Sequence, residues 1–175
     1  MDIIAIICII IAIIGLLSIG FVNIYNRFQE SLIRINEVES DIDTILRKRF
    51  DLLNKSISII KNELPDENPL TIIEELHSKK MTNFDLDRSL YQAINEFETY
   101  KNKIKDVEIK KIASILNETE AELIAYRKYY NDVTTDYNKL RHKFPSNLVA
   151  TICGYKDRNY YDNKNLLKEN DNFKL

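Results

Sequence analysis

The sequence predicts an all-α protein, in which an N-terminal transmembrane helix is followed by an antiparallel three- to four-helix bundle with long helices. Three observations support this fold class. Residues 3–22 form an apolar run without a charged residue. After it, apolar residues recur with the period of a helix over long segments, and no segment shows the apolar–polar alternation of a strand. The chain of 175 residues also has only three Gly and three Pro, which favours long helices joined by few turns.

The first element, residues 3–22, is expected to be a membrane anchor. Roughly 20 helical residues span about 30 Å, the thickness of the hydrocarbon core of a bilayer. A cleaved signal peptide would have a basic n-region and a shorter apolar run, whereas this run is long and follows Asp2. Lys and Arg occur only after the run, beginning with Arg27 and Arg34. We therefore expect the N-terminus outside and the domain in the cytoplasm.

The second element is an amphipathic helix over residues 28–64. Its apolar residues recur at steps of three, four or seven: Phe28, Leu32, Ile35, Ile42, Leu46, Leu53 and Ile60. Glu39, Arg49 and Ser56 interrupt this stripe, and Pro65 ends the helix. No helix breaker separates this segment from the anchor, so the sequence allows one continuous helix.

Residues 70–105 have a less regular pattern. A short helix is expected over residues 70–76, and Thr82 or Asn83 can cap the next helix. The apolar residues of that helix are Leu86, Leu90, Ile94, Phe97 and Ile104. The pattern leaves open whether the region is one kinked helix or two helices.

Residues 109–144 have the most regular repeat in the chain. Their apolar positions alternate steps of three and four: Ile109, Ile112, Leu116, Thr119, Leu123, Tyr126, Tyr130, Val133, Tyr137, Leu140 and Phe144. Pro145 ends this helix, a loop or short helix follows, and the polar stretch from Asp157 is expected to fray. The predicted organisation is an anchor (1–24), a helical domain (25–155) and a polar tail (156–175).

A polar row lies beside this apolar seam and provides the candidate site. The row supplies Glu120, Arg127, Asn131 and Asn138, and the adjacent seam supplies Tyr130 and Tyr137; these six are the candidate site residues. One interpretation is a pocket for a peptide or small ligand, and the other is a polar layer that fixes helix register.

Arg127 decides between these interpretations. It lies two helical turns from Glu120, about 10 Å along the axis, so the two residues cannot pair tightly by themselves. We therefore expect Arg127 to meet an acid of the first helix, with Glu37, Asp41 and Asp51 as candidates.

Composition and motifs argue against several functional classes. The net charge is −2 and no concentrated basic face is evident, so nucleic acid is not an expected partner. Glu74 and His77 have helical metal-ligand spacing, but no second motif completes a site, and His142 is expected on the surface. Cys8 and Cys153 suggest no disulfide framework. We expect no cofactor, no metal and no enzymatic activity, because no nucleophile–base pair or phosphate loop is present.

Several short motifs occur along the chain in a recognisable order. They are Tyr25-Asn26, Arg47-Lys48-Arg49-Phe50-Asp51-Leu52, Thr119-Glu120, Arg127, Tyr130-Asn131, Tyr137-Asn138 and Phe144-Pro145-Ser146. In this order the chain resembles the LemA family, most specifically over residues 120–150 and least over 65–107. The resemblance implies a bacterial membrane protein with an N-terminal anchor, a helical-bundle domain and no established enzymatic activity.

Together, the residues and the resemblance lead to one functional expectation and two alternatives. We expect a single-pass protein of the bacterial cell membrane that acts as a non-catalytic interaction or scaffold module with an unidentified protein partner. The first alternative is a sensor that binds a peptide or small ligand through the polar row. The second, a membrane-bound hydrolase, is the least favoured.

Overall fold

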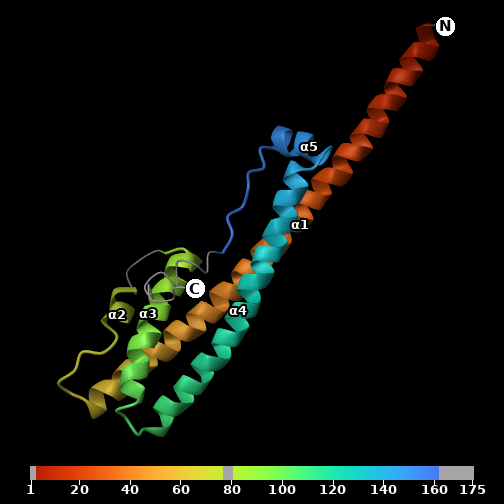
Figure 1. Cartoon of the computed structure of the whole chain (residues 1–175). Coiled ribbons are helices and arrows are strands. Elements are labelled where there is room, and N and C mark those ends of the chain that lie inside the picture. Colours follow the sequence, from red (N-terminus) through yellow and green to blue (C-terminus); the bar gives the residue numbers. More distant parts are fainter. Residues whose placement is uncertain (1–2, 77–80, 162–175) are drawn as a thin grey trace, which may run out of the picture. The chain divides into compact units, whose positions relative to one another are not determined.

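The structure, a computed structural model, describes residues 3–76 and 81–161 (Figure 1). Within these two ranges the regular elements are all helices, which confirms the all-α class and the long apolar helix at the N-terminus. In chain order they are α1 (Ile3–Glu63), α2 (Thr71–Leu76), α3 (Asn83–Lys101), α4 (Val107–His142) and α5 (Ser146–Cys153).

The anchor run and the first amphipathic segment form one continuous helix, α1. The side chains of residues 3–20 are all exposed, and the buried stripe begins at Phe28. At the other end, the Leu64 N–H donates to the Ile60 carbonyl at 2.8 Å, so the last turn closes immediately before Pro65. The chain turns there because proline lacks the N–H that would continue the helix.

The less regular region contains two separate helices, which resolves the alternative that the sequence left open. Thr82 caps α3, and its hydroxyl accepts a hydrogen bond from the Asp85 N–H at 3.3 Å. Leu70, just before α2, has a φ of 55° and is fully buried. Its N–H donates to Glu96 of α3 at 2.8 Å, so this contact stabilises a backbone conformation that leucine rarely adopts.

Contacts divide the chain into two compact units. Among the described residues, the first unit contains 3–37 and 131–160, and the second contains 38–76, 81–130 and 161. In the first unit the ring of Phe28 packs edge-on against Tyr137, with ring centroids 5.9 Å apart. The core of the second unit includes Ile42, Leu46, Leu53, Ile73, Leu90, Phe97, Ile109, Leu116 and Leu123.

The segment after α4 begins with a short helix, which is one of the two alternatives that the sequence left open. Residues 146–153 form the helix α5, which ends at Gly154 with a φ of 71°. The Gly154 N–H bonds back to the α5 carbonyls, in the left-handed conformation that glycine adopts at low cost. The expectation of fraying from Asp157 is wrong for residues 157–161, which bind α4 and α3 through contacts described below. The rest of the predicted tail lies outside the described residues, and the domain boundaries stay predictions.

Candidate functional site

The centre of the candidate site is a buried ion pair between α4 and α3 in the second unit. Arg127 and Asp87 are 6% and 1% exposed. The Arg127 Nε donates to one oxygen of Asp87 at 2.9 Å, and Nη2 donates to the other at 2.5 Å. This two-pronged geometry is the strongest arrangement that a guanidinium and a carboxylate form. It joins residues 40 positions apart in the chain.

The expectation that Arg127 would meet Glu37, Asp41 or Asp51 of the first helix is therefore wrong. The first helix instead supplies Arg49, which binds Glu120 of α4 at 2.6 Å. Glu120 and Arg127 lie two turns apart on the same face of α4, and their side chains reach different neighbours: Glu120 binds Arg49 of α1 and Arg127 binds Asp87 of α3. The acid that meets Arg127 comes from α3 because Asp87 lies on the buried face of that helix, three residues before Leu90.

Glu120 links the two pairs. Its second carboxylate oxygen lies 3.5 Å from Nη1 of Arg127, a long contact that agrees with the expectation that these two residues do not pair tightly. Burial alone would lower the pKa of Arg127, but the hydrogen bonds and charge of Asp87 outweigh it, with help from Glu120, and raise that pKa. Arg127 therefore stays charged in the interior of the domain.

Tyr161 completes the network from the end of the described chain. Its hydroxyl donates to Asp87 at 2.8 Å, and its ring lies against the Arg127 guanidinium, 5.7 Å from its carbon. The same ring packs on Phe84, with centroids 4.4 Å apart. Burial raises the pKa of Tyr161 well above its usual value, and the adjacent Asp87 carboxylate raises it further. The phenol is thus held neutral as a hydrogen-bond donor.

Tyr130, one turn beyond Arg127, lies in the same unit. Its hydroxyl donates to the Glu39 carboxylate of α1 at 3.3 Å, and its ring lies edge-on to Tyr161 at 6.0 Å. Glu120, Arg127 and Tyr130 therefore belong to one network that joins α1, α3, α4 and the segment near Tyr161. These contacts lie within the chain and between its helices.

The other three candidate residues lie in the first unit and have a different role. The Tyr137 hydroxyl donates to the Lys156 carbonyl at 3.0 Å. The Asn138 amide donates to the Arg158 carbonyl at 2.9 Å, and its oxygen accepts from the Arg158 N–H at 3.0 Å. The Asn131 carbonyl accepts from the Thr135 hydroxyl at 2.8 Å. Tyr137 and Asn138 thus hold the segment after α5 against α4.

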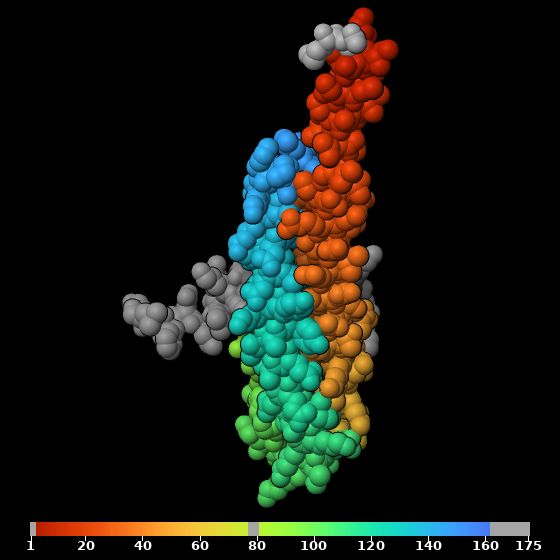
Figure 2. All heavy atoms as spheres, turned by 90° about the vertical axis from the view of Figure 1, so that its right-hand side faces the viewer, coloured from red at the N-terminus to blue at the C-terminus, as the bar shows by residue number. Residues whose placement is uncertain are grey.

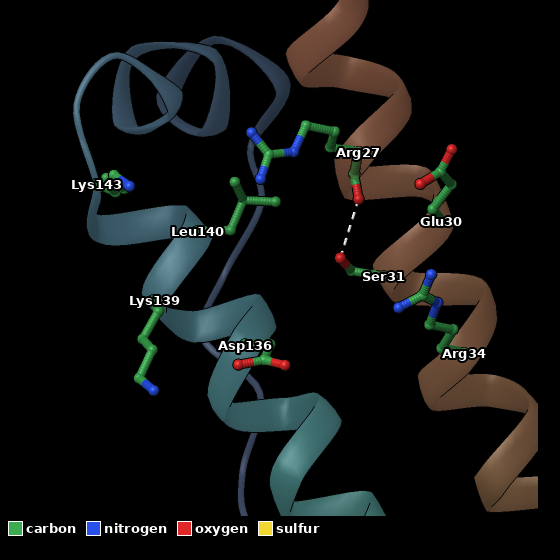
Figure 3. A pocket seen from close by; sticks show the side chains of 8 residues that line it. All are labelled: Arg27, Glu30, Ser31, Arg34, Asp136, Lys139, Leu140 and Lys143. Atoms are coloured by element: carbon green, nitrogen blue, oxygen red, sulfur yellow. Dashed lines mark hydrogen bonds between the residues drawn. The ribbon is translucent and has the colours of Figure 1, made fainter.

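The first unit also has a surface pocket of about 400 Å³ between α1 and α4 (Figure 3). Four basic side chains line it, together with two acids, a serine and a leucine: Arg27, Arg34, Lys139, Lys143, Glu30, Asp136, Ser31 and Leu140. Figure 3 shows the Arg27 guanidinium extended towards α4. In the sequence, Arg27 and Arg34 were considered only as the basic flank of the apolar run. That they line a pocket together with residues of α4 was not predicted.

Sequence reasoning missed Asp87 and Tyr161. It noticed Arg49 as an interruption of the apolar stripe and as part of a short motif, but did not predict its contact with Glu120. An acid at an apolar position of a helix, as at Asp87, is the signal that could have found the partner of Arg127. Among the described residues no cluster of His, Cys, Asp or Glu could hold a metal ion. His77 lies outside the described residues, and exposed His142 lies 3.1 Å from Asp157.

Comparison with known proteins identifies a family. The model of the LemA family matches residues 38–173, which is most of the chain. The chain therefore belongs to the LemA family. No curated protein and no solved structure matches it.

Proposed function

We propose that this LemA-family chain is a single-pass protein of the bacterial cell membrane, whose helical domain is a non-catalytic interaction or scaffold module. The principal support is the surface of α1. Residues 3–20 present an exposed and almost wholly apolar surface, of a size that soluble proteins rarely leave in water. A helix of this length and composition can cross a membrane.

The polar residues of α4 favour an interaction module over an enzyme. Arg127, Glu120 and Tyr130 bind partners on neighbouring helices, while Tyr137 and Asn138 bind a segment of the same chain. Groups satisfied in this way position helices, and a buried polar layer of this kind is suited to fixing helix register. We infer that the module binds its partner through its outer surface.

We also propose that the domain is an antiparallel bundle built around α1 and α4. Three contacts in the second unit support this pairing, since the α1 residue number rises as the α4 number falls. Glu39 meets Tyr130, Arg49 meets Glu120 and Lys55 meets Glu108. This order is the one expected for antiparallel neighbours in a bundle.

A sensor is the second candidate function. Its support is a pocket of about 560 Å³ in the first unit that Asn138 lines, together with Thr135, His142 and Arg158. A peptide or small ligand bound there would contact the polar row that the sequence singled out.

The anchor and its orientation are tested in intact cells and isolated membranes. We expect the full chain to resist carbonate extraction, and protease added outside intact cells to spare the domain while it digests an outward-facing control protein. Extraction by carbonate would contradict the anchor. Digestion of the domain before lysis would contradict the orientation.

Crosslinking in native membranes followed by mass spectrometry separates the scaffold from the sensor. The wild type is compared with an Asp87→Leu and Arg127→Leu double variant, which replaces the buried pair by apolar groups, and with Asn138→Ala. A scaffold should retain its crosslinked protein in both variants. Loss of the crosslinked protein from a variant that stays folded would favour binding through the polar row. In a separate measurement, a stoichiometric cofactor or metal in the purified chain would contradict the non-catalytic proposal.

A further inference from the structure

The surface around α5 has an apolar patch that the described chain leaves uncovered. Phe144, Leu148 and Ile152 are 74%, 55% and 73% exposed. Leu148 and Ile152 lie one turn apart on the same face of α5, and Phe144 lies just before the helix. The opposite face packs into the first unit through Val149 and Ala150. This short helix therefore has apolar side chains on both its inner and its outer face.

Contacts within the first unit place α5 beside the end of the apolar run of α1 (Figures 1 and 2). Tyr155 follows the cap residue Gly154 of α5, and its ring centroid lies 4.7 Å from that of Phe28 and 6.4 Å from that of Tyr25. Its hydroxyl accepts a hydrogen bond from the Gln29 amide at 2.8 Å. These contacts hold the C-terminal end of α5 at the level of residues 25–29 of α1.

This level corresponds to a defined depth if α1 spans a bilayer. Residues 25–29 lie three to seven positions beyond Val22, the last residue of the apolar run, which corresponds to about 5–10 Å along the helix. The headgroup region and its boundary with the acyl chains occupy that depth, and interfacial helices insert their apolar faces there. Tyr25 and Tyr155 also have the amphipathic rings that collect at this boundary.

Basic side chains gather near the Phe144 end of the apolar patch. Lys143 immediately precedes Phe144. Arg27 of α1 lines the same pocket as Lys143 (Figure 3), and Arg34 and Lys139 line it too. The structure gives none of these four bases an ion pair among the described residues, although Glu30 and Asp136 line the same pocket. An excess of cations beside exposed apolar groups is complementary to anionic lipid phosphates above acyl chains.

We propose that α5 is a second membrane contact, which lies in the interface of the same bilayer that α1 spans. Phe144, Leu148 and Ile152 enter the boundary with the acyl chains, while Arg27 and Lys143 bind the phosphates of anionic lipids. This inference rests on the proposed anchor and adds a lipid-binding surface to it. The contact holds the first unit against the membrane at a second point, so that α1 cannot rotate freely about its axis.

Depth-dependent fluorescence quenching tests the apolar part. The full chain, with Cys8→Ser and Cys153→Ser, is labelled at one new cysteine and reconstituted into vesicles of phosphatidylcholine and phosphatidylglycerol with brominated acyl chains. Labels at Leu148→Cys and Ile152→Cys should be quenched. A label at Glu37→Cys, exposed on α1 about 22 Å beyond Val22, should not be quenched.

A label at Ile11→Cys separates the two proposals. If Ile11→Cys is quenched and both α5 labels are not, the anchor stands and the α5 contact is refuted, as it would be if a protein partner covered the patch. If Ile11→Cys itself is not quenched, the proposed anchor fails.

The electrostatic part is tested with Arg27→Gln and Lys143→Gln together. This variant should lose quenching at Ile152→Cys, and replacement of phosphatidylglycerol by phosphatidylcholine should produce a similar loss in the parent chain. The matched control, Lys110→Gln with Lys111→Gln, removes two exposed charges elsewhere on α4 and should keep the parent quenching. Equal quenching in phosphatidylcholine alone would refute recognition of anionic lipid.

Discussion

Truncation of Arg127 to alanine tests the role of the buried ion pair most directly. Both members are almost inaccessible to water, and Arg127 supplies both of the short hydrogen bonds that reach the Asp87 oxygens from α4. Arg127→Ala leaves a buried carboxylate with the Tyr161 hydroxyl as its donor. Glu120 loses its weaker contact and keeps Arg49.

The expected loss is large because a charge is left buried without its counterion. Removing one partner of a buried pair costs about 3–5 kcal/mol, a sizeable share of the 5–15 kcal/mol that stabilises a typical domain. For a chain of this size, each kcal/mol corresponds to about 2–4 °C in Tm, so Arg127→Ala should melt roughly 6–20 °C lower. Replacing both charges, in Asp87→Leu with Arg127→Leu, should recover part of this loss.

The change in Tm is measured by thermal unfolding of the full chain in detergent micelles. Far-ultraviolet circular dichroism follows the unfolding, because the chain has no Trp for fluorescence. Arg47→Ala is the matched control, because it breaks an exposed pair with Asp43 four residues away. That control should melt close to the wild type. If Arg127→Ala has the same Tm as Arg47→Ala, the Arg127–Asp87 pair does not stabilise the domain. If it also loses a crosslinked partner, the polar row is a binding site.

Three further predictions follow from single contacts. Stability should fall as the pH rises above about 10, because the unfolded chain releases a Tyr161 proton that the folded chain retains; Tyr161→Phe should flatten this slope in denaturant titrations at several pH values. Gly154→Ala should cost about 1–2 kcal/mol from the left-handed backbone alone, because no atom lies near the added Cβ, and Gly154→Asn should melt higher than Gly154→Ala. Thr82→Ala should cost about 1 kcal/mol through loss of the α3 cap to Asp85, whereas Thr82→Ser should melt near the wild type.

Helices and their ends could be predicted from the sequence because local physics determines them. The period of the apolar residues identified α1 and α4, and Pro65 and Pro145 marked where they stop. Thr82, one of the two caps that the sequence offered, marks the start of α3. The motifs around Arg127 were also sufficient to indicate the family, since they need only residue identity and order.

Partners between helices needed the tertiary structure. The helical period places Arg127 beside the seam, but it does not say whether that side of α4 faces α1 or α3. It faces α3, so the counterion of Arg127 is Asp87 and not an acid of α1. Tyr161 reaches the same carboxylate from 74 positions away, within a segment whose polar composition indicated fraying.

The candidate site was divided for the same reason. A row along one helix is continuous in sequence, yet its ends pack against different neighbours: Glu120, Arg127 and Tyr130 join helices, while Tyr137 and Asn138 hold the segment after α5. The sequence alone determined which residues form helices and which faces are polar, because neighbours along the chain decide both. Only the tertiary structure decided what each polar face meets, because that depends on which helices pack together.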